Sequence, residues 1–158
     1  MVASFRAPDH AALTEDLTRL REGGLRRLPG LRLPALGAVA HYLDEQAETA
    51  PGVELALRKA VQRLGGGDYG DAAEHLFGLS QGTRARSSAE RRELAAGAIN
   101  RTADTFRKRY EKDLLSEIAN QVLALCAEAR LRETHTQLER RHPAESRLVL
   151  QSDFVMIM

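Results

Sequence analysis

The chain has 158 residues, of which 43% are hydrophobic, so it is long enough to bury a core. It contains no run of 18 apolar residues that would span a membrane. Its 23 Lys and Arg residues nearly balance 22 Asp and Glu residues, and the net charge of +1 by itself indicates no class of partner. A single cysteine excludes an intrachain disulfide, and the first residues lack the apolar core of a signal peptide, so we expect a cytoplasmic protein with no membrane partner.

The apolar residues are mostly Leu and Ala, and aromatic residues make up only 4% of the chain, which favours helices over strands. We predict an all-α fold of about six helices. An N-terminal helical lobe is expected over residues 9–64, and a three-helix lobe with a long last helix over residues 70–142. Residues 143–158 form a tail that would pack on the helices, add a strand to a partner or mark a cut from a longer chain; the sequence leaves these open.

Three helices are predicted in the N-terminal lobe. Asp9 is a suitable N-cap for the first helix, which should end at Gly23 and Gly24. Pro34 stands where a second helix would begin, and the Pro51-Gly52 pair predicts a break before the third. Apolar residues at helical spacing give the inward faces: Leu13, Leu17, Leu20, Leu36, Val39, Ala40, Leu43, Val53, Leu57, Ala60, Val61 and Leu64.

The stretch "GGGDYG" is expected to link two helices rather than to hold a phosphate, because no Lys-Ser/Thr pair follows it. Asp71 should begin a short helix that carries His75 at its surface or edge, with no second metal ligand four residues on. After the polar loop "SQGTRARSS", Ser87 and Glu90 have the spacing of a capping box and predict the start of the next helix.

The longest periodic run predicts a single helix that begins after Asn100. Its inward stripe comprises Phe106, Tyr110, Leu114, Ile118, Val122, Cys126 and Ala129. Cys126 is therefore interpreted as a small core residue. Beyond Ala129 only Leu131 and Leu138 are apolar, so this end of the helix is either solvated or paired with another chain.

Residues around Asn100 have the pattern of a helix-turn-helix. Ala96 is the small residue at which two helices would cross, and Ile99 is the apolar residue before the turn. Asn100 stands where glycine is usual, and Asn tolerates a positive φ better than other non-glycine residues. Thr102 is a good N-cap for the second helix, and Phe106 would anchor that helix in the core.

The second helix of this motif reads "TFRKR" from Thr105 to Arg109, in the order Thr, apolar, basic, any residue, Arg. From Arg91 to about Leu115 the segment resembles the helix-turn-helix of the sigma-factor domain that reads the promoter −35 element, and of related regulators, which have Val or Ile where this chain has Arg101. The resemblance implies a transcriptional regulator whose second helix, about residues 102–115, binds double-stranded DNA. The wider stretch also resembles an uncharacterised helical module of filamentous actinobacteria, found alone or attached to signalling and defence-type domains.

The charge of this region fits a DNA-binding function. Residues 83–112 contain nine cations and four anions, a net charge of +5 in a chain of net charge +1. The cations lie mostly on the helix face opposite Phe106, where phosphates and base edges would be reached. The predicted DNA-binding residues are Arg84, Arg86, Arg101, Thr102, Thr105, Arg107, Lys108, Arg109 and Lys112.

The alternative is a helical adaptor in a signalling or defence system, because small three-helix bundles also bind proteins. It would form a homodimer or bind a protein partner through the last helix or the tail. A continuous positive surface including Lys108 and Arg84 would favour DNA, and an apolar groove along the last helix would favour the adaptor. No catalytic residue, metal ligand or cofactor is predicted: no serine lies in a nucleophile elbow, and Cys126 and His135 are nine residues apart on one helix.

Overall fold

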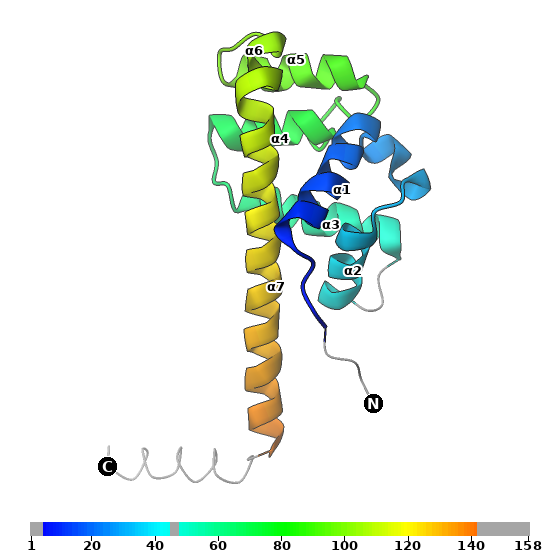
Figure 1. Ribbon diagram of the computed structural model, residues 1–158, viewed down its shortest axis with the longest axis vertical. Coiled ribbons are helices and arrows are strands. Elements are labelled where there is room, and N and C mark those ends of the chain that lie inside the picture. Colours follow the sequence, from blue (N-terminus) through cyan, green and yellow to red (C-terminus); the bar gives the residue numbers. More distant parts are fainter. Residues whose placement is uncertain (1–4, 45–47, 142–158) are drawn as a thin grey trace, which may run out of the picture. The chain divides into compact units, whose positions relative to one another are not determined.

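The computed structural model describes residues 5–44 and 48–141 of the chain (Figure 1). Within these residues the secondary structure is helical and contains no strand, which confirms the all-α prediction. The elements are α1 (His10–Gly23), the 3₁₀ helix η1 (Leu25–Gly30), α2 (Pro34–Leu43), α3 (Thr49–Gln62), α4 (Asp68–Phe77), α5 (Ser88–Ala98), α6 (Ala103–Thr105), the π-helical turn η2 (Phe106–Tyr110) and α7 (Glu111–Arg141). The predicted tail, residues 143–158, lies outside the described residues.

The chain forms two compact units, one up to Cys126 and one from Ala127 onward. The hydrophobic core of the first unit includes residues from both predicted lobes: Leu13, Leu36, Leu57, Leu76, Phe106 and Ile118 are all fully buried in it. In the second unit, residues 127–141 belong to α7 and are exposed or half-buried. No helix in the described part of the chain is long and apolar enough to cross a membrane.

The first helix begins and ends as predicted, and the second begins as predicted. The Asp9 carboxylate accepts a hydrogen bond from the backbone N–H of Ala12 at 2.8 Å and caps α1. Gly24 ends this helix with a φ of 73°, a conformation that favours glycine. Pro34 occupies the first turn of α2. Backbone N–H groups in the first turn have no acceptor within the helix, so the lack of an N–H in proline costs no hydrogen bond there.

The predicted break at Pro51-Gly52 is wrong. Helix α3 begins at Thr49, so Pro51 lies within its first turn and Gly52 is buried in the helix. Proline is compatible with this position because the first N–H groups of a helix have no acceptor within it. The pair therefore marks the beginning of a helix rather than a gap between helices.

Helix α4 begins at Asp68 rather than at the predicted Asp71. Its first turn contains Gly70, where an added Cβ would lie 2.5 Å from the backbone oxygen of Gly65. A glycine at this position thus allows the new helix to start directly against the end of the preceding segment. The link between α3 and α4 is therefore shorter than predicted, because Asp68, Tyr69 and Gly70 belong to α4.

A buried aspartate joins α1 to α2. Asp16 is 2% exposed, and its Oδ2 accepts hydrogen bonds from the N–H groups of Ala35 at 2.7 Å and Leu36 at 3.0 Å. The side chain of Arg19 donates to its Oδ1 at 3.2 Å. The carboxylate therefore satisfies two N–H groups in the first turn of α2 from a position about twenty residues earlier in the chain.

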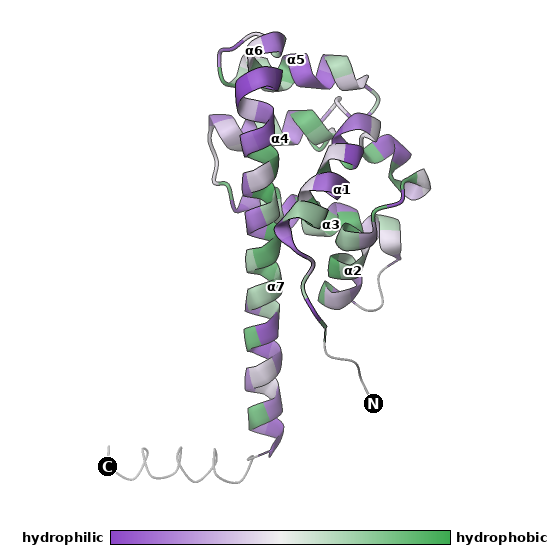
Figure 2. Cartoon of the chain, viewed as in Figure 1, coloured by the Kyte–Doolittle hydropathy of each residue, from purple (hydrophilic) through white to green (hydrophobic). Residues whose placement is uncertain are grey.

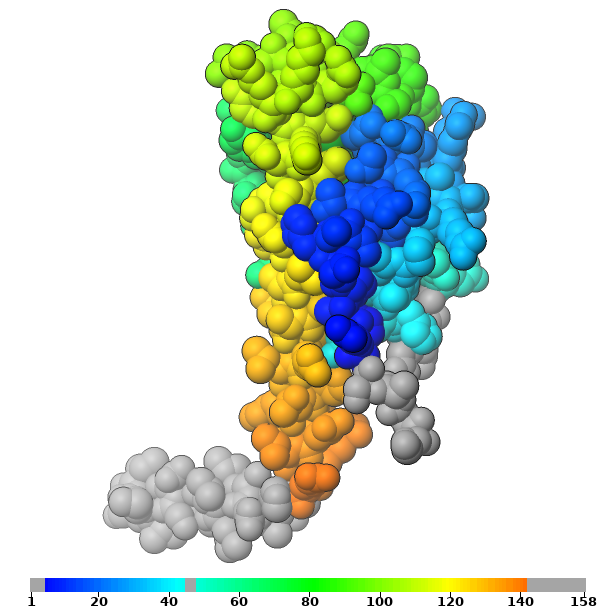
Figure 3. Space-filling model, viewed as in Figure 1, coloured from blue at the N-terminus to red at the C-terminus, as the bar shows by residue number. Residues whose placement is uncertain are grey.

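Helices α4 and α5 lie antiparallel and pack against each other, and the run from α6 into α7 crosses the end of α5 (Figure 1). The chain reverses between α4 and α5 at Gly78, which has a φ of 84°. The beginning of α1 lies beside the first half of α7 (Figure 3). There His10 Nε2 lies 3.1 Å from the backbone oxygen of Ser116. Helices α4 and α5 thus form an antiparallel pair, which α6 and η2 join at the end of α5.

The predicted inward stripe of the last helix is confirmed at most of its positions. Its buried members are Phe106, Leu114, Ile118, Val122 and Cys126. Figure 2 shows hydrophobic residues through the middle of α7 and mostly hydrophilic ones toward its end.

Tyr110 differs from the prediction because it is only half-buried, and Glu111 is buried in its place. The cause is the π-helical turn η2, in which the N–H of Glu111 bonds to the carbonyl of Phe106, five residues earlier. A spacing of four residues therefore fails to predict the inward position after Phe106.

Candidate nucleic-acid interface

The turn between α5 and α6 has the conformation expected from the sequence. Asn100 has a φ of 57°, and it is the one non-glycine residue in the described ranges with a positive φ. The N–H of Arg101 bonds to the carbonyl of Ala96 at 2.9 Å, and the N–H of Asn100 bonds to that of Gly97 at 3.1 Å. These two bonds are the Schellman pattern, which closes the end of α5 and redirects the chain.

The second helix starts at the predicted cap. The hydroxyl of Thr102 accepts a hydrogen bond from the N–H of Thr105 at 3.2 Å and donates to the hydroxyl of Thr105 at 3.0 Å. One turn later Phe106 is fully buried, and Ala96 on α5 is 1% exposed in the same core. The turn, the cap and the anchor therefore orient the helix so that its opposite face meets solvent.

That opposite face is cationic. The side chains of Arg101, Arg107, Lys108, Arg109 and Lys112 are all exposed. The exposed anion among residues 101–112 is Asp104, and Asp113 follows directly after Lys112. Arg109 and Lys112 make no ion pair within the described ranges. The guanidinium carbon of Arg101 lies 5.8 Å from the centroid of the Tyr110 ring, within the range of a cation–π contact.

Asp104 neutralises part of this surface. Arg107 donates to its Oδ1 at 3.2 Å, and Lys108 Nζ lies 3.0 Å from its Oδ2. The hydrogen bonds from Lys108 and then from Arg107 lower the pKa of Asp104. All three side chains are more than half exposed, so these ion pairs can exchange readily for contacts with a phosphate.

Arg84 and Arg86 lie at the other end of α5. They belong to the segment that precedes this helix, whereas residues 101–112 follow it, and 11 helical residues separate the two sites by about 16 Å. Arg84 pairs with Glu54 at 2.6 Å, and Arg86 pairs with Glu90 at 3.1 Å. The structure thus brings seven of the predicted residues together around the second helix and places these two apart.

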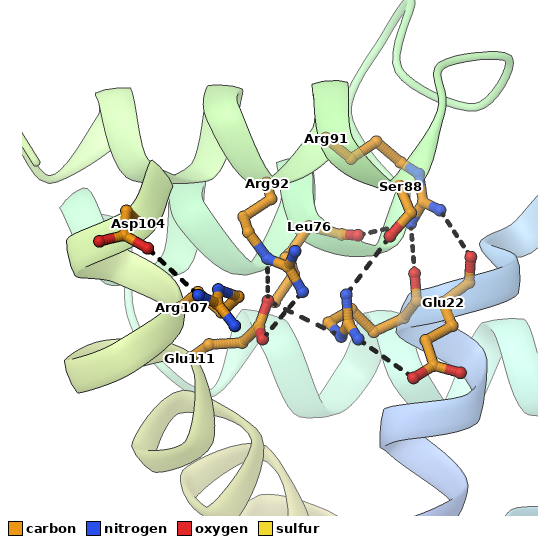
Figure 4. A network of polar contacts seen from close by, with 9 residues as sticks. Glu22, Leu76, Ser88, Arg91, Arg92, Asp104, Arg107 and Glu111 are labelled. Atoms are coloured by element: carbon orange, nitrogen blue, oxygen red, sulfur yellow. Dashed lines mark hydrogen bonds and ion pairs between the residues drawn. The ribbon is translucent and has the colours of Figure 1, made fainter. Parts of the chain in front are cut away.

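Three further arginines are used within the fold (Figure 4). Arg92 forms two hydrogen bonds to the buried carboxylate of Glu111, at 2.9 Å and 3.2 Å. Arg21 Nε lies 3.7 Å from the same carboxylate, and burial lowers the pKa of Arg21. Because Arg92 and Glu111 bind each other, neither contributes to the charge that a phosphate would meet.

Arg91 is also buried, and it bonds to backbone carbonyls. Its Nη1 donates to the carbonyls of Arg21 at 2.9 Å and Leu76 at 2.6 Å, and its Nε donates to that of Arg86 at 3.2 Å. Burial, and then the charge of Arg21, lowers the pKa of Arg91. The net charge of +5 for residues 83–112 includes Arg91 and Arg92, because nothing in the local sequence distinguishes a buried arginine from a solvated one.

The described residues contain no group of three or more His, Cys, Asp or Glu side chains that could hold a metal ion. His75 is half-buried, and its Nδ1 lies 2.8 Å from the hydroxyl of Ser80. Comparisons with protein-family models, with curated proteins and with solved structures find no significant match to this chain.

Proposed function

We propose that the protein binds double-stranded DNA through the surface formed by Arg101, Thr102, Thr105, Arg107, Lys108, Arg109 and Lys112, as a helix-turn-helix regulator. The observation that carries the proposal is the start of the second helix. The same turns that bury Phe106 expose a row of cations on the opposite face. A recognition helix needs this combination, because the core must fix its orientation while its outer side chains enter the major groove.

The cap gives Thr102 and Thr105 a defined place within this proposal. Their hydroxyls bond to each other at the first turn of the helix, where a recognition helix contacts base edges. The flanking cations Arg107, Lys108 and Lys112 would contact phosphates, which supply affinity without reading sequence. Thr105→Ala is therefore expected to relax sequence preference more than it lowers affinity.

The test is duplex DNA binding measured by fluorescence anisotropy across a salt series. The triple variant R107A/K108A/K112A should bind more weakly, and the slope of log affinity against log salt should become shallower by about 2 to 3. The matched control K59A/R130A/R132A removes three exposed cations elsewhere and should leave the slope nearly unchanged. An unchanged slope in the first variant, or a native protein without affinity for DNA at low salt, would refute the proposal.

The second candidate function is a helical adaptor that forms a homodimer through α7. The observation that favours it lies in the second unit, where Leu131 and Leu138 are 72% and 53% exposed. They are seven residues apart and so lie on one face of the helix, the spacing of a coiled-coil seam. Light scattering tests this candidate: a dimer that L131E/L138E converts to a monomer supports it, and a native monomer contradicts it.

A further inference from the structure

A cleft of about 610 Å³ lies in the first unit, between the end of α1, η1 and the segment that leads into α5. Its walls include five arginines from three separate parts of the chain: Arg26, Arg27, Arg84, Arg86 and Arg91. The volume is in the range of small-molecule sites. The lining is dominated by charged and small polar side chains, so a ligand here would be recognised by charge rather than by apolar contact.

The charges of the cleft do not cancel. Its two acids each have an arginine partner, since Glu22 lies 3.4 Å from Arg21 and Glu90 lies 3.1 Å from Arg86. Arg26 and Arg27 are exposed and have no ion-pair partner in the part of the chain that the structure describes. The cleft therefore holds a positive excess, available for an anion, that the protein does not itself neutralise.

Arg91 adds a buried positive charge to the wall. Arg91 is 2% exposed, and its guanidinium bonds only to carbonyl oxygens within the described residues, so no carboxylate balances its charge there. Hydrogen bonds to neutral acceptors satisfy its N–H groups but leave the net charge in place. The backbone of Gly24 packs closely against the Arg91 guanidinium, since a Cβ added at Gly24 would lie only 2.9 Å from it. This close packing restricts the position of the guanidinium.

The cleft also contains the beginning of α5. Ser87 caps this helix, and Ser87 and Ser88 both line the cleft. The first N–H groups of a helix have no acceptor within it, and the helix dipole is positive at this end, so both favour an anion. Together with the arginines they provide donors of the kind that bind phosphate oxygens.

We infer that this cleft binds a small ligand that carries several linked phosphate groups, in the form of either a free polyphosphate or a nucleoside polyphosphate. Several phosphates are needed because the arginines come from different walls, and one phosphate would contact only some of them. The inference does not depend on DNA binding, since the cleft and the surface of residues 101–112 lie at opposite ends of α5.

The experiment measures binding of inorganic tripolyphosphate to the full chain by calorimetry, at constant ionic strength, followed by the same titration with a nucleoside triphosphate. The variant R26A/R27A removes the two unpaired arginines and should weaken binding about tenfold or more. R84A/R86A removes two cleft arginines from another segment and should act in the same direction. The control R130A/R132A removes equal charge from exposed positions on α7 and should bind like the native protein.

Saturable binding at one site, lost in both cleft variants and kept in the control, supports the inference. If the nucleoside triphosphate then binds much more tightly than tripolyphosphate, the ligand is a nucleotide; equal affinities assign recognition to the phosphate chain alone. Absence of saturable tripolyphosphate binding overturns the inference, and so does an equal loss in cleft and control variants. It is also overturned if the cleft variants impair DNA binding while tripolyphosphate neither binds nor competes, because the cleft would then belong to a nucleic-acid surface.

Discussion

Glu111 and Arg92 face each other across the junction of α5 and α7, joined by two hydrogen bonds of 2.9 Å and 3.2 Å. The π-helical turn sets this relationship, because it brings Glu111 to the inward face five residues after Phe106. Arg21 approaches the same carboxylate from α1. One acidic side chain thus connects three helices, at the base of the surface proposed to bind DNA.

Glu111→Ala should destabilise the protein by about 3 kcal/mol, because it leaves the positive charges of Arg92 and Arg21 without their carboxylate. The free energy of unfolding from urea denaturation measures the effect. Asp113→Ala removes an exposed acid on the same helix and serves as the control. Equal losses in the two variants would show that the Glu111 pair contributes nothing specific.

Leu114→Ala should cost about 2–5 kcal/mol of stability, because Leu114 is 5% exposed within the core stripe. Leu131→Ala makes the same chemical change on the same helix at a side chain that is 72% exposed. It should change the free energy of unfolding by less than about 0.5 kcal/mol. Thermal unfolding of both variants is the measurement, and a stable Leu114→Ala protein would contradict the described packing.

Gly70→Ala and Gly97→Ala should have opposite effects. A Cβ at Gly70 would lie 2.5 Å from the backbone oxygen of Gly65, so the two segments must separate and stability should fall. A Cβ at Gly97, which is exposed within α5, meets nothing within 4 Å. Alanine there should raise stability by about 0.5–1 kcal/mol through the lower entropy of the unfolded chain. Chemical denaturation of both variants measures the change in the free energy of unfolding, which should be a decrease for Gly70→Ala and an increase for Gly97→Ala.

Asp104→Asn should strengthen duplex DNA binding, given the proposed function. The change removes the carboxylate that holds Lys108 and Arg107, so both cations become free to meet phosphates. Anisotropy titrations at low salt should show a several-fold increase in affinity. Glu93→Gln, an exposed acid on α5, is the control and should have a smaller effect. Weaker binding by Asp104→Asn would indicate that Asp104 orients the cations rather than competing for them.

The buried thiol of Cys126 should make the stability of the protein fall as the solution becomes alkaline. Burial raises the pKa of its thiol, so the folded state holds the proton more tightly than the unfolded state does. The associated stability is complete below the pKa of the unfolded thiol and is lost as the pH rises through that of the folded one. The native protein should therefore lose more stability than Cys126→Ala in that range, as measured by urea denaturation at a series of pH values.

Local features of the sequence were sufficient to predict the turn and its flanks. The left-handed conformation of Asn100, the cap at Thr102 and the anchor at Phe106 each follow from the chemistry of one side chain and its immediate neighbours. The N-caps at Asp9 and Ser87 are predictable for the same reason. The start of α3 differs from the prediction because Pro51 is equally compatible with a break and with a first helical turn.

Interactions between distant residues were not predictable in the same way. Asp16 and Arg91 are charged residues of the kind usually found at the surface, yet both are 2% exposed. Their hydrogen-bond partners belong to other helices that are distant in the sequence. Arg26 and Arg27 lie in η1, between the first two predicted helices, and only the fold brings them to the same cleft as Arg84 and Arg86. The π-helical turn places Glu111 rather than Tyr110 on the inward face, and the spacing of hydrophobic residues contains no signal for that turn.

The π-helical turn also determines where the long helical run can tolerate a change of length. It contains one residue more than an α-helical turn, so deletion of one residue among Arg107, Lys108 and Arg109 would leave Phe106 and Glu111 four residues apart. Both side chains would still point inward, and the register of α7 beyond them would be preserved. The same deletion between Leu114 and Cys126 would rotate the remaining stripe by about 100° and expose it. The segment that carries the proposed DNA contacts is therefore the part of this helix in which length can vary without loss of the core.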